Sequence, residues 1–436
     1  MQTPYWIDGV TLPAFRAADG ALRTDAVVVG GGITGATAAY LLKQAGLSVI
    51  LLERDRCGSG DTAHTSAHVT AVTDATAAAD LGFDARLVES APGVRRPGVR
   101  FDHQARFRPM EYLDALLRAI DGDGSHVFEH SGVTTVDDEP LVVHTDKARI
   151  STSLVVVATH VPILGKASLA KGTLLQTDLY PYSSYVVSAR VPKQSWPDAL
   201  IFDLSDPYYF FRLDPGDTHD MLIAGGCDHK TGQTTDTHKP LEQLRAVVQQ
   251  LVPTAEITHQ WTGQVIETRD RLPYIGEVAK GQFAITGFGG NGITFGTLGA
   301  MMARDHATGR TNPWTGLFDI NRTLLTDGLW HYVRENSDYP YHMVRDRVAG
   351  ADGDDLRSVP PGEGRIIDLR GNRVAAYRRE SGTLSLMSPI CPHMGCVVNW
   401  NAADSTWDCP CHGSRFSPTG RVLRGPAESD LSSHQE

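Results

Sequence analysis

The most constraining segment of this chain lies near its end, where two short loops each carry one cysteine and one histidine. The loops read Cys391-Pro-His393 and Cys409-Pro-Cys-His412, and fifteen residues separate His393 from Cys409. Such a set can bind zinc tetrahedrally or a [2Fe-2S] cluster with two cysteines on one iron and two histidines on the other. Because each loop mixes the two ligand types, whereas zinc sites more often pair cysteines and then histidines, the pattern favours the cluster.

Two further cysteines stand beside these loops. Cys396 follows the first loop and Cys411 lies within the second, so a disulfide between them could clamp the loops together. In a reducing cytosol such a bond would need burial to persist. The other two cysteines, Cys57 and Cys227, are isolated in the sequence, so the chain is not a disulfide scaffold.

The length and charge of the chain narrow the classes of function. A chain of 436 residues is long enough for two or three domains. Its net charge of -11 disfavours nucleic acid or an anionic membrane surface as a partner. No apolar run approaches the roughly 18 residues of a membrane span, and the first residues do not resemble a signal peptide. We therefore expect a cytoplasmic protein.

The N-terminal part has the pattern of a dinucleotide-binding unit. A strand, a glycine-rich turn, a helix and a second strand are predicted over residues 25–29, 30–35, 36–44 and 48–52. The turn has the spacing G-x-G-x-x-G, and Glu53 follows the second strand about 20 residues after the glycines. A glycine-rich turn without a ligand is the alternative, but all four elements and the acid are in place.

Each residue of this turn has a physical use. Gly30 allows the tight turn, and Gly32 lets the backbone approach a pyrophosphate at the N-terminus of the helix. Gly35 lets helix and strand pack closely, and Thr34 belongs to the same turn. Glu53 would accept hydrogen bonds from the ribose hydroxyls of the adenosine.

The segment after Glu53 is rich in glycine and hydroxyl residues, which suits a long FAD lying across the domain. Here the chain resembles the glycine/D-amino-acid oxidase (DAO) superfamily of FAD enzymes. In that family a similar loop runs beside the pyrophosphate and the flavin. The resemblance implies FAD contacts from Arg54, Thr62, His64, Thr65 and Ser66.

His64 has two interpretations. In the dimethylglycine and sarcosine dehydrogenase branch of the family, a histidine of this loop is bonded covalently to the flavin, and His64 matches that position by spacing. The alternative is a histidine that only forms hydrogen bonds near the flavin.

Later segments carry the same resemblance, at residues 106–113, 153–159 and 261–276. A second glycine-rich loop at 287–296 follows a strand, and in the family this loop closes the FAD domain and aims a helix N-terminus at the flavin. The partial positive charge of a helix N-terminus favours hydride acceptance there. The resemblance implies further FAD contacts from Gly287, Gly289, Gly290, Asn291, Gly292 and Ile293.

Between these segments, the chain has the alternation of a multi-stranded sheet, which in the family covers the flavin. Arg212 stands among aromatic residues that include Tyr209, and an arginine with aromatics suits the carboxylate of an amino acid. Arg269 lies in the segment that the family places beside the isoalloxazine. These three are the candidate catalytic residues, and an arginine at the rim of an ordinary sheet is the alternative for Arg212.

One interval departs from the family. Only about 30 residues separate Asp74 from Arg106, where the family usually has a longer stretch with helices over the flavin. The short interval at 75–105 raises the question of how closed the active site is and whether the enzyme is fully active.

The C-terminal region resembles a Rieske [2Fe-2S] domain, with Cys391, His393, Cys409 and His412 as ligands and Cys396–Cys411 as the disulfide. Ser414 matches the residue whose hydroxyl bonds a bridging sulfide in high-potential Rieske proteins. Where those proteins have tyrosine, this chain has Phe416. Loss of that hydrogen bond to a ligand thiolate predicts a lower potential.

The resemblances together imply an α/β FAD-binding, Rossmann-like domain of DAO type with an inserted mixed-sheet substrate domain, followed by an all-β Rieske domain. We expect the oxidoreductase at 1–335, with FAD-binding parts at about 22–74, 145–165 and 262–312 and the substrate sheet at about 170–260. A linker is expected at 336–357 and the Rieske domain at 358–436.

These domains imply an oxidoreductase that takes a hydride from an amine or amino acid (a D-amino acid, glycine or an N-methyl amine) and sends electrons singly through the cluster to an external acceptor. One alternative is a reductase or hydroxylase in which the cluster feeds the flavin. Another is a redox-sensing or inactive scaffold, which the short interval makes plausible. No nicotinamide site is visible in the sequence.

Overall fold

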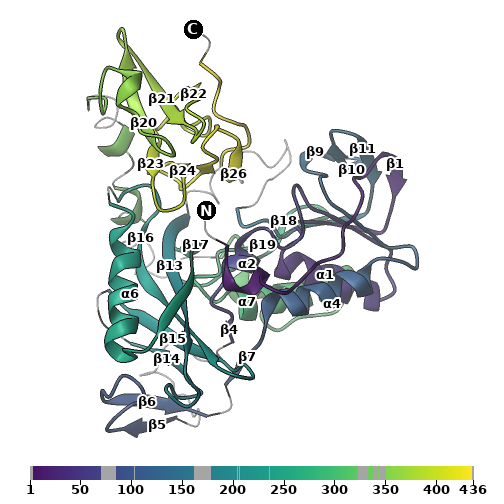
Figure 1. The fold of residues 1–436 in the computed structure, drawn as a ribbon. Coiled ribbons are helices and arrows are strands. Elements are labelled where there is room, and N and C mark those ends of the chain that lie inside the picture. Colours follow the sequence, from purple (N-terminus) through teal and green to yellow (C-terminus); the bar gives the residue numbers. More distant parts are fainter. Residues whose placement is uncertain are drawn as a thin grey trace.

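The computed structural model of the protein describes residues 3–69, 85–102, 104–161, 178–203, 207–234, 236–322 and 350–434, together with residues 205, 332, 334–337, 339 and 341–343. Figure 1 shows an N-terminal α/β part and a C-terminal all-β part that lies against one sheet of the first. This arrangement agrees with the fold class expected from the sequence.

A six-stranded sheet in the order β18-β19-β12-β2-β3-β8 forms the centre of the dinucleotide-binding part. Its strands are β2 (Ala26–Val29), β3 (Val49–Leu52), β8 (His126–Phe128), β12 (Leu154–Val157), β18 (Tyr274–Ala279) and β19 (Gln282–Thr286). All pairs are parallel except β18 with β19. The strands β2, β3 and β12 are buried along their whole length, as their short apolar runs predict for a parallel sheet covered on both faces.

Three long helices pack in this part: α1 (Ile33–Gln44), α4 (Pro109–Ile120) and α7 (Gly292–Ala307). Pro109 opens α4, where its missing N–H leaves no hydrogen bond unmade. The shorter helices are α2 (Asp61–His64) and α8 (Thr315–Phe318). Among the described helices, none combines the length and hydrophobicity that crossing a membrane requires.

A smaller four-stranded sheet lies beside this core. It consists of β1 (Gly20–Arg23), β9 (Val133–Asp138), β10 (Leu141–Thr145) and β11 (Ala148–Ser151). Two hairpin-like pairs complete the part: β4 (His68–Val69) with β7 (Ala105–Arg106), and β5 (Ala85–Val88) with β6 (Gly98–Phe101). The pair β5–β6 falls inside the short interval noted in the sequence, and residues 70–84 of that interval lie outside the described residues.

The predicted substrate sheet has five antiparallel strands in the order β14-β15-β16-β13-β17. They are β13 (Leu179–Val191), β14 (Leu200–Phe202), β15 (Tyr209–Asp214), β16 (Asp220–Lys230) and β17 (Glu256–Thr268), and α6 (Lys239–Leu251) covers part of one face (Figure 1). Because β17 pairs with β13 as far as Thr268, residues 262–268 belong to this sheet, and they are also the start of the segment expected at the FAD.

The C-terminal part contains only strands and one 3-10 turn (Leu356–Ser358) among its described residues. Its two sheets are β20 (Gly364–Leu369), β21 (Asn372–Arg378) and β22 (Leu384–Met387), and β23 (Asn399–Asn401), β24 (Thr406–Asp408), β25 (Arg415–Phe416) and β26 (Val422–Arg424). Asp352 already donates its N–H to Ile366 at 2.7 Å. The domain therefore begins a few residues before the expected end of the linker.

Gly35 sets the contact between α1 and β2. A Cβ added at Gly35 would lie 1.9 Å from the carbonyl oxygen of Gly30. We expect Gly35→Ala to destabilise the protein by about 3 kcal/mol, since backbone on both sides of the contact resists the extra methyl group. Thermal unfolding and the flavin retained after gel filtration measure the effect. Gly316→Ala is the control, because its Cβ would have no atom within 4 Å; equal melting temperatures for the two variants would refute the packing argument.

Candidate functional site

The two long strands β13 and β17 give the five-stranded sheet two chemically different faces. Along β17, Gly263, Val265 and Glu267 alternate with Thr262 and Gln264, so the two sets point in opposite directions. We call the face of Gly263 and Glu267 the inner face, and the face of Thr262 and Gln264 the outer face. The inner face lies toward the dinucleotide-binding part, and the outer face meets α6 and the all-β domain.

The inner face meets the loop that follows β3. The indole Nε1 of Trp261 donates to the carbonyl oxygen of His64 at 3.0 Å. A Cβ at Gly263 would lie 3.0 Å from the same oxygen. On the other side, Gly289 donates its N–H to the carbonyl of Ile266 at 2.8 Å. The two loops that the sequence assigned to FAD therefore lie beside neighbouring residues of β17.

The residues around this space fit an FAD. Gly263, Val265 and Glu267 are partly exposed, whereas Thr262 and Gln264 of the outer face are buried, so the inner face borders an open space. Gly289 and Gly290 both have positive φ, 51° and 82°, and a Cβ at Gly289 would meet nothing within 4 Å. These open glycines before α7 form a cradle in which backbone can approach a cofactor closely.

The first turn and Glu53 also have the expected geometry. The Glu53 carboxylate follows β3 directly and accepts the N–H of Gly31 at 2.7 Å and that of Asp55 at 2.9 Å. These bonds fix the carboxylate next to the glycine turn. The Thr62 hydroxyl accepts the N–H of Ile33 at 2.9 Å, which ties the second loop to the first turn of α1.

His64 is buried, with 8% of its surface exposed, and its Nδ1 lies 2.8 Å from the carbonyl oxygen of Gly60. Burial, with a further contribution from the Arg424 charge, lowers the pKa of His64, so its imidazole is neutral near pH 7. Its Nε2 has no hydrogen-bond partner within the described ranges. The covalent and the hydrogen-bonding interpretation of His64 both stay predictions.

Other loop residues expected at FAD have different contacts. Arg54 donates from Nη2 to the carbonyl of Leu423 at 2.6 Å, so it joins the two domains. Its contact to FAD stays a prediction beside this bond to the residue in β26. The Thr65 carbonyl accepts the Trp6 indole at 2.6 Å, and the Ser66 hydroxyl lies 2.9 Å from His68 Nδ1.

Arg212 does not face an open site. Its side chain is fully buried, its guanidinium lies 4.8 Å from the ring centre of Trp6, and Nη1 donates to the carbonyl of Ala67 at 2.7 Å. Asp214 is the nearest acid, at 3.6 Å. The structure thus corrects the prediction of a carboxylate-binding arginine, since Arg212 closes the edge of the inner face against a loop.

Of the other two catalytic candidates, Tyr209 lies on the outer face, and the role of Arg269 stays a prediction. Tyr209 packs among the residues beneath α6, on the outer face, because it is one position out of phase with Arg212. Arg269 lies just past the end of β17, where Nη2 is 3.4 Å from Asp178. Sequence alternation already separated Tyr208 from Tyr209, but only the strand register decides which of them faces inward.

The four predicted cluster ligands come together at the tip of the all-β domain. The thiol groups of Cys391 and Cys409 are within hydrogen-bonding distance of each other. The rings of His393 and His412 lie 4.8 Å apart, centre to centre, at an angle of 89°. Backbone N–H groups of His393 and His412 are directed at the two sulfurs. Two thiolates opposite two imidazoles form the donor set that a Rieske cluster needs.

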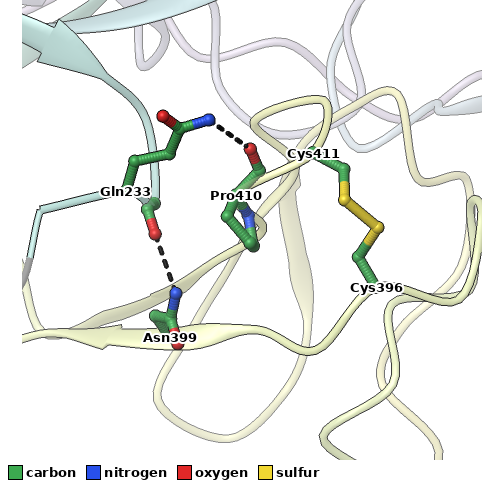
Figure 2. The surroundings of a disulfide bond; sticks show 6 residues. Gln233, Cys396, Asn399, Pro410 and Cys411 are labelled. Atoms are coloured by element: carbon green, nitrogen blue, oxygen red, sulfur yellow. Dashed lines mark hydrogen bonds between the residues drawn. A yellow bond between two sulfur atoms is a disulfide. The ribbon is translucent and has the colours of Figure 1, made fainter. Parts of the chain in front are cut away.

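Cys396 and Cys411 form a disulfide, as the sequence suggested, and both are buried (Figure 2). The sulfur of Cys409 lies within 4.8 Å of both disulfide sulfurs. Ser414 is fully buried, accepts the N–H of Ala427 at 2.9 Å and hydrogen-bonds Cys391. The disulfide and Ser414 therefore stabilise the two cluster loops in one relative position.

The second cluster loop rests on the outer face of the five-stranded sheet. The Gln264 amide donates to the carbonyl of Gly413 at 2.9 Å, directly after the ligand His412. Its backbone N–H donates to Asp61 of α2 at 3.3 Å. Gln233 donates to the carbonyl of Pro410 at 3.0 Å (Figure 2). Gln264 thus touches both the loop expected at the flavin and the loop expected at the cluster.

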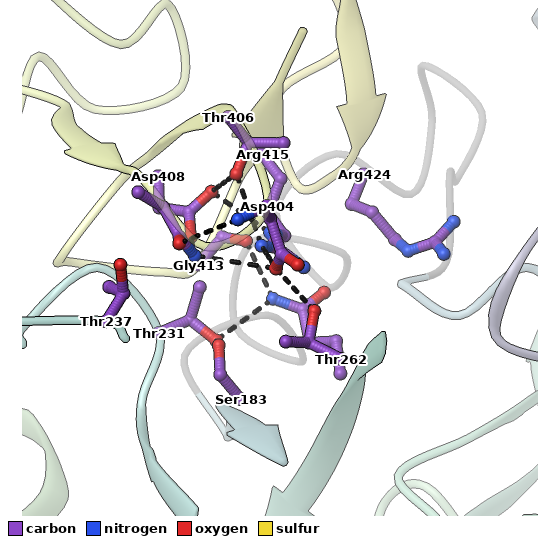
Figure 3. A network of polar contacts seen from close by, with 12 residues as sticks. Ser183, Thr231, Thr237, Thr262, Asp404, Thr406, Asp408, Gly413, Arg415 and Arg424 are labelled. Atoms are coloured by element: carbon purple, nitrogen blue, oxygen red, sulfur yellow. Dashed lines mark hydrogen bonds and ion pairs between the residues drawn. The ribbon is translucent and has the colours of Figure 1, made fainter. Parts of the chain in front are cut away.

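A buried polar network fastens the same interface (Figure 3). The hydroxyl of Thr262 donates to Asp404, which also pairs with Arg415. Arg415 Nε lies 3.0 Å from Asp408. Sequence reasoning missed these residues, because a single buried arginine between two acids has no fixed sequence spacing.

A second ion pair crosses the interface at α2. Arg424 of β26 lies 3.2 Å from Asp61 and His160 lies 3.7 Å from it. Burial alone would raise the pKa of Asp61, but Arg424 and the neighbouring histidines outweigh burial and lower this pKa to about 2. The carboxylate is therefore ionised at neutral pH and joins the two domains.

Comparison with known proteins agrees with the assignment of the α/β part and of the all-β part. Residues 25–92 and 74–305 match the DAO family, described as FAD dependent oxidoreductase, and residues 353–435 match the Rieske [2Fe-2S] domain. The DAO match falls into two segments that meet at residues 74–92, in the interval that is short in this chain.

Individual relatives cover the chain in different ways. A putative Rieske 2Fe-2S iron-sulfur protein of Bacillus subtilis (YhfW) is 28% identical over 498 aligned positions, covering 98% of this chain and 96% of the relative. A cytochrome b6-f complex iron-sulfur subunit of Cyanophora paradoxa is 40% identical over 79 residues, 17% of this chain and 33% of the relative. Glycine oxidase from Geobacillus kaustophilus shares the fold, with a TM-score of 0.59 and 19% identity over 70% of this chain and all of that one.

Phe416 gives a direct test of the cluster environment. It is fully buried in β25, two residues after Ser414. We expect Phe416→Tyr to raise the midpoint potential by about 50 mV, because a hydrogen bond of about 1 kcal/mol to a ligand thiolate favours the reduced, more negative cluster. Redox titration followed by EPR measures the change. Tyr377→Phe, outside the cluster loops, is the control, and an unchanged or lower potential in Phe416→Tyr would contradict the prediction.

Proposed function

The chain belongs to the DAO family of FAD dependent oxidoreductases and ends in a Rieske [2Fe-2S] domain, and from this premise we propose that it oxidises an amine or amino acid and passes the electrons out through the cluster. Its cofactors are FAD and a [2Fe-2S] cluster. We propose the class of substrate, the direction of electron flow and the use of an external acceptor.

The reaction balances as follows. The substrate carbon loses a hydride, its nitrogen loses a proton, and the C–N bond becomes a C=N bond that water can hydrolyse. When bound, FAD accepts two electrons as a hydride and the [2Fe-2S] cluster carries one electron at a time. Each substrate molecule therefore reduces two equivalents of an external one-electron acceptor.

One observation carries the proposal: the cluster loop lies on the outer face of the sheet whose inner face borders the flavin space. Gln264 and Gly263 are neighbours in β17, and they contact Gly413 and the His64 loop, respectively. The cluster loop is thus separated from the flavin loops by one layer of backbone. A chain built for direct reaction of reduced flavin with oxygen has no use for this arrangement.

The protein's own residues hold the parts in place. Glu53, Thr62 and the glycines before α7 position the FAD, and Trp261 holds the His64 loop against β17. The helix α7 begins at Gly292, so its positive end lies at the open cradle. Tight packing of both cofactor sites against one sheet excludes bulk water from the path between them.

A second candidate function runs the electrons in reverse, from an external donor through the cluster to the flavin. The same interface supports it, because electron transfer between two fixed sites is reversible. A redox-sensing scaffold is the third, and the short interval at 75–105, where the two segments of the DAO match overlap, is the observation in its favour.

Anaerobic reduction distinguishes these candidates. We expect an amine or amino acid to bleach the flavin and then to produce the EPR signal of the reduced cluster, since hydride transfer precedes single-electron transfer. A panel of D-amino acids, N-methyl amines and primary amines is mixed with the holoenzyme and followed by absorption and EPR. Bleaching only by reduced ferredoxin would instead support the reverse direction, and no bleaching by either would support the scaffold.

Gln264 tests the route between the cofactors. We expect Gln264→Ala to leave flavin reduction unchanged and to slow the following cluster reduction about tenfold, because loss of a hydrogen bond worth about 1.4 kcal/mol weakens the docked contact by that factor. Stopped-flow absorption with dithionite-reduced or substrate-reduced flavin measures both steps. Gln260→Ala is matched, since Gln260 lies on the same face of β17 but contacts Arg245 of α6; equal rates in the two variants would refute the route.

A further inference from the structure

The inner face carries polar residues beyond the flavin space that the proposed reaction has not used. They lie on three adjacent strands and on the turn before β15: Tyr182, Ser184, Tyr208, Asp228 and Glu267. An irregularity in the register of β13 with β16, between Ser183 and Tyr185, shifts β16 by one residue there. This bulge turns Asp228 to the inner face, whereas its neighbour His229 points to the outer face and contacts Tyr185 at 2.9 Å.

Asp228 is hydrogen-bonded through one carboxylate oxygen, whereas the other is buried and has no partner among the described residues. The Tyr208 hydroxyl donates to Oδ2 of Asp228 at 2.7 Å, and Ser184 also hydrogen-bonds this carboxyl group. The second oxygen, Oδ1, is buried and has no hydrogen-bond partner within the described residues. A buried carboxylate oxygen without a donor is costly unless a ligand supplies one.

The charges around Asp228 leave room for a cation. Within the described part of the chain, neither Asp228 nor Glu267 has an ion-pair partner within 4.0 Å. Lys230, the nearest lysine on the strand, lies 2.9 Å from Glu335, and the exposed Arg334 lies 3.4 Å from the same acid. Arg271 is exposed to solvent beyond the end of β17.

Burial has the same effect on both carboxyl groups. It raises the pKa of Asp228 and that of Glu267; at Glu267 the charges of Arg271 and Arg334 oppose burial, and those of Glu335 and Asp228 add to it. A cation placed between them would offset this burial and repulsion. The geometry agrees, since neither carboxylate forms an ion pair within 4.0 Å among the described residues.

The charges that act most on Asp228 and Glu267 include neither Arg212 nor Arg269. Arg212 is fully buried beside Trp6, where Nη1 donates to backbone carbonyls and Nη2 lies 3.6 Å from Asp214, although Nε and Nη2 have no hydrogen-bond partner among the described residues. Arg269 pairs with Asp178. An amino-acid carboxylate bound on the inner face would therefore lie beside Asp228 and Glu267 and be repelled by like charge.

We propose, in a step that rests on the proposed function, that the substrate is a cationic amine without an adjacent carboxylate. Asp228, oriented by Tyr208, pairs with the ammonium group of this amine and accepts its proton. In that step an N–H bond of the ammonium breaks, an O–H bond forms at Oδ1 of Asp228, and the electron pair stays on nitrogen. The neutral amine can then lose hydride from its carbon. Glu267 adds to the recognition of positive charge, and Tyr208 is a positioning residue.

Binding to the oxidised holoenzyme tests this inference without turnover. The probes are two matched pairs, benzylamine against phenylglycine and 1,4-diaminobutane against ornithine, which differ by one carboxylate. Dissociation constants come from perturbation of the flavin absorption spectrum under anaerobic conditions. We expect each amine to bind at least tenfold more tightly than its amino acid, and Asp228→Asn to abolish this preference.

Matched variants separate an effect of charge on amine binding from an effect on folding. Glu267→Gln removes a second negative charge from the inner face, whereas Glu256→Gln removes one from the exposed start of the same strand, where Glu256 pairs with Arg190. We expect the first to weaken amine binding severalfold and the second to leave it unchanged, with equal melting temperatures. Tyr208→Phe should weaken amine binding less than Asp228→Asn and shift the pH profile of binding, which a purely structural role would not do.

The outcomes also separate this inference from the proposed function. Amines that bind in an Asp228-dependent manner without bleaching the flavin would support the recognition site and count against amine oxidation. Amino acids that bleach the flavin and bind as tightly as the amines would support the oxidation and overturn the amine class. Failure of both amines to bind, or unchanged binding in Asp228→Asn, would also overturn it.

Discussion

The alternation of side chains along two paired strands is the constraint on which the rest of this structure depends. Because successive residues of a strand point to opposite faces, β17 presents Gly263 to the flavin loop and Gln264 to the cluster loop within two positions. One layer of backbone therefore separates the loop expected at the flavin from the loop expected at the cluster. Its antiparallel pairing with β13 over almost its whole length keeps this layer rigid.

A buried polar network joins the Rieske domain to the five-stranded sheet. Arg415 is buried with Asp404 and Asp408, and Thr262 supplies a hydrogen bond from the sheet. A buried ion pair adds little net stability, but removal of one partner costs about 3–5 kcal/mol. Such a network selects one orientation of the domain, and that orientation brings the second cluster loop to Gln264.

The inner and outer faces of the five-stranded sheet carry different polar groups. The outer face contacts Gly413, Asp404 and α6, whereas the inner face carries Asp228, whose Oδ1 is buried without a donor among the described residues. Polar groups left unsatisfied in an otherwise well-paired sheet are expected where a ligand completes the site. The acids Asp228 and Glu267 then decide the charge of that ligand, just as the cysteines and histidines decide the metal centre.

The sequence by itself determined the features that depend on local spacing. The cluster ligands, the disulfide, the glycine turn with Glu53 and the second glycine loop each lie within a short stretch of chain with a fixed spacing, so a motif captures them. Only the tertiary structure decided which face each strand residue occupies and which loop Arg54, Arg212 and Gln264 contact. A one-residue bulge moves a side chain to the opposite face of a sheet, and partners more than 100 positions apart leave no periodic trace in the sequence.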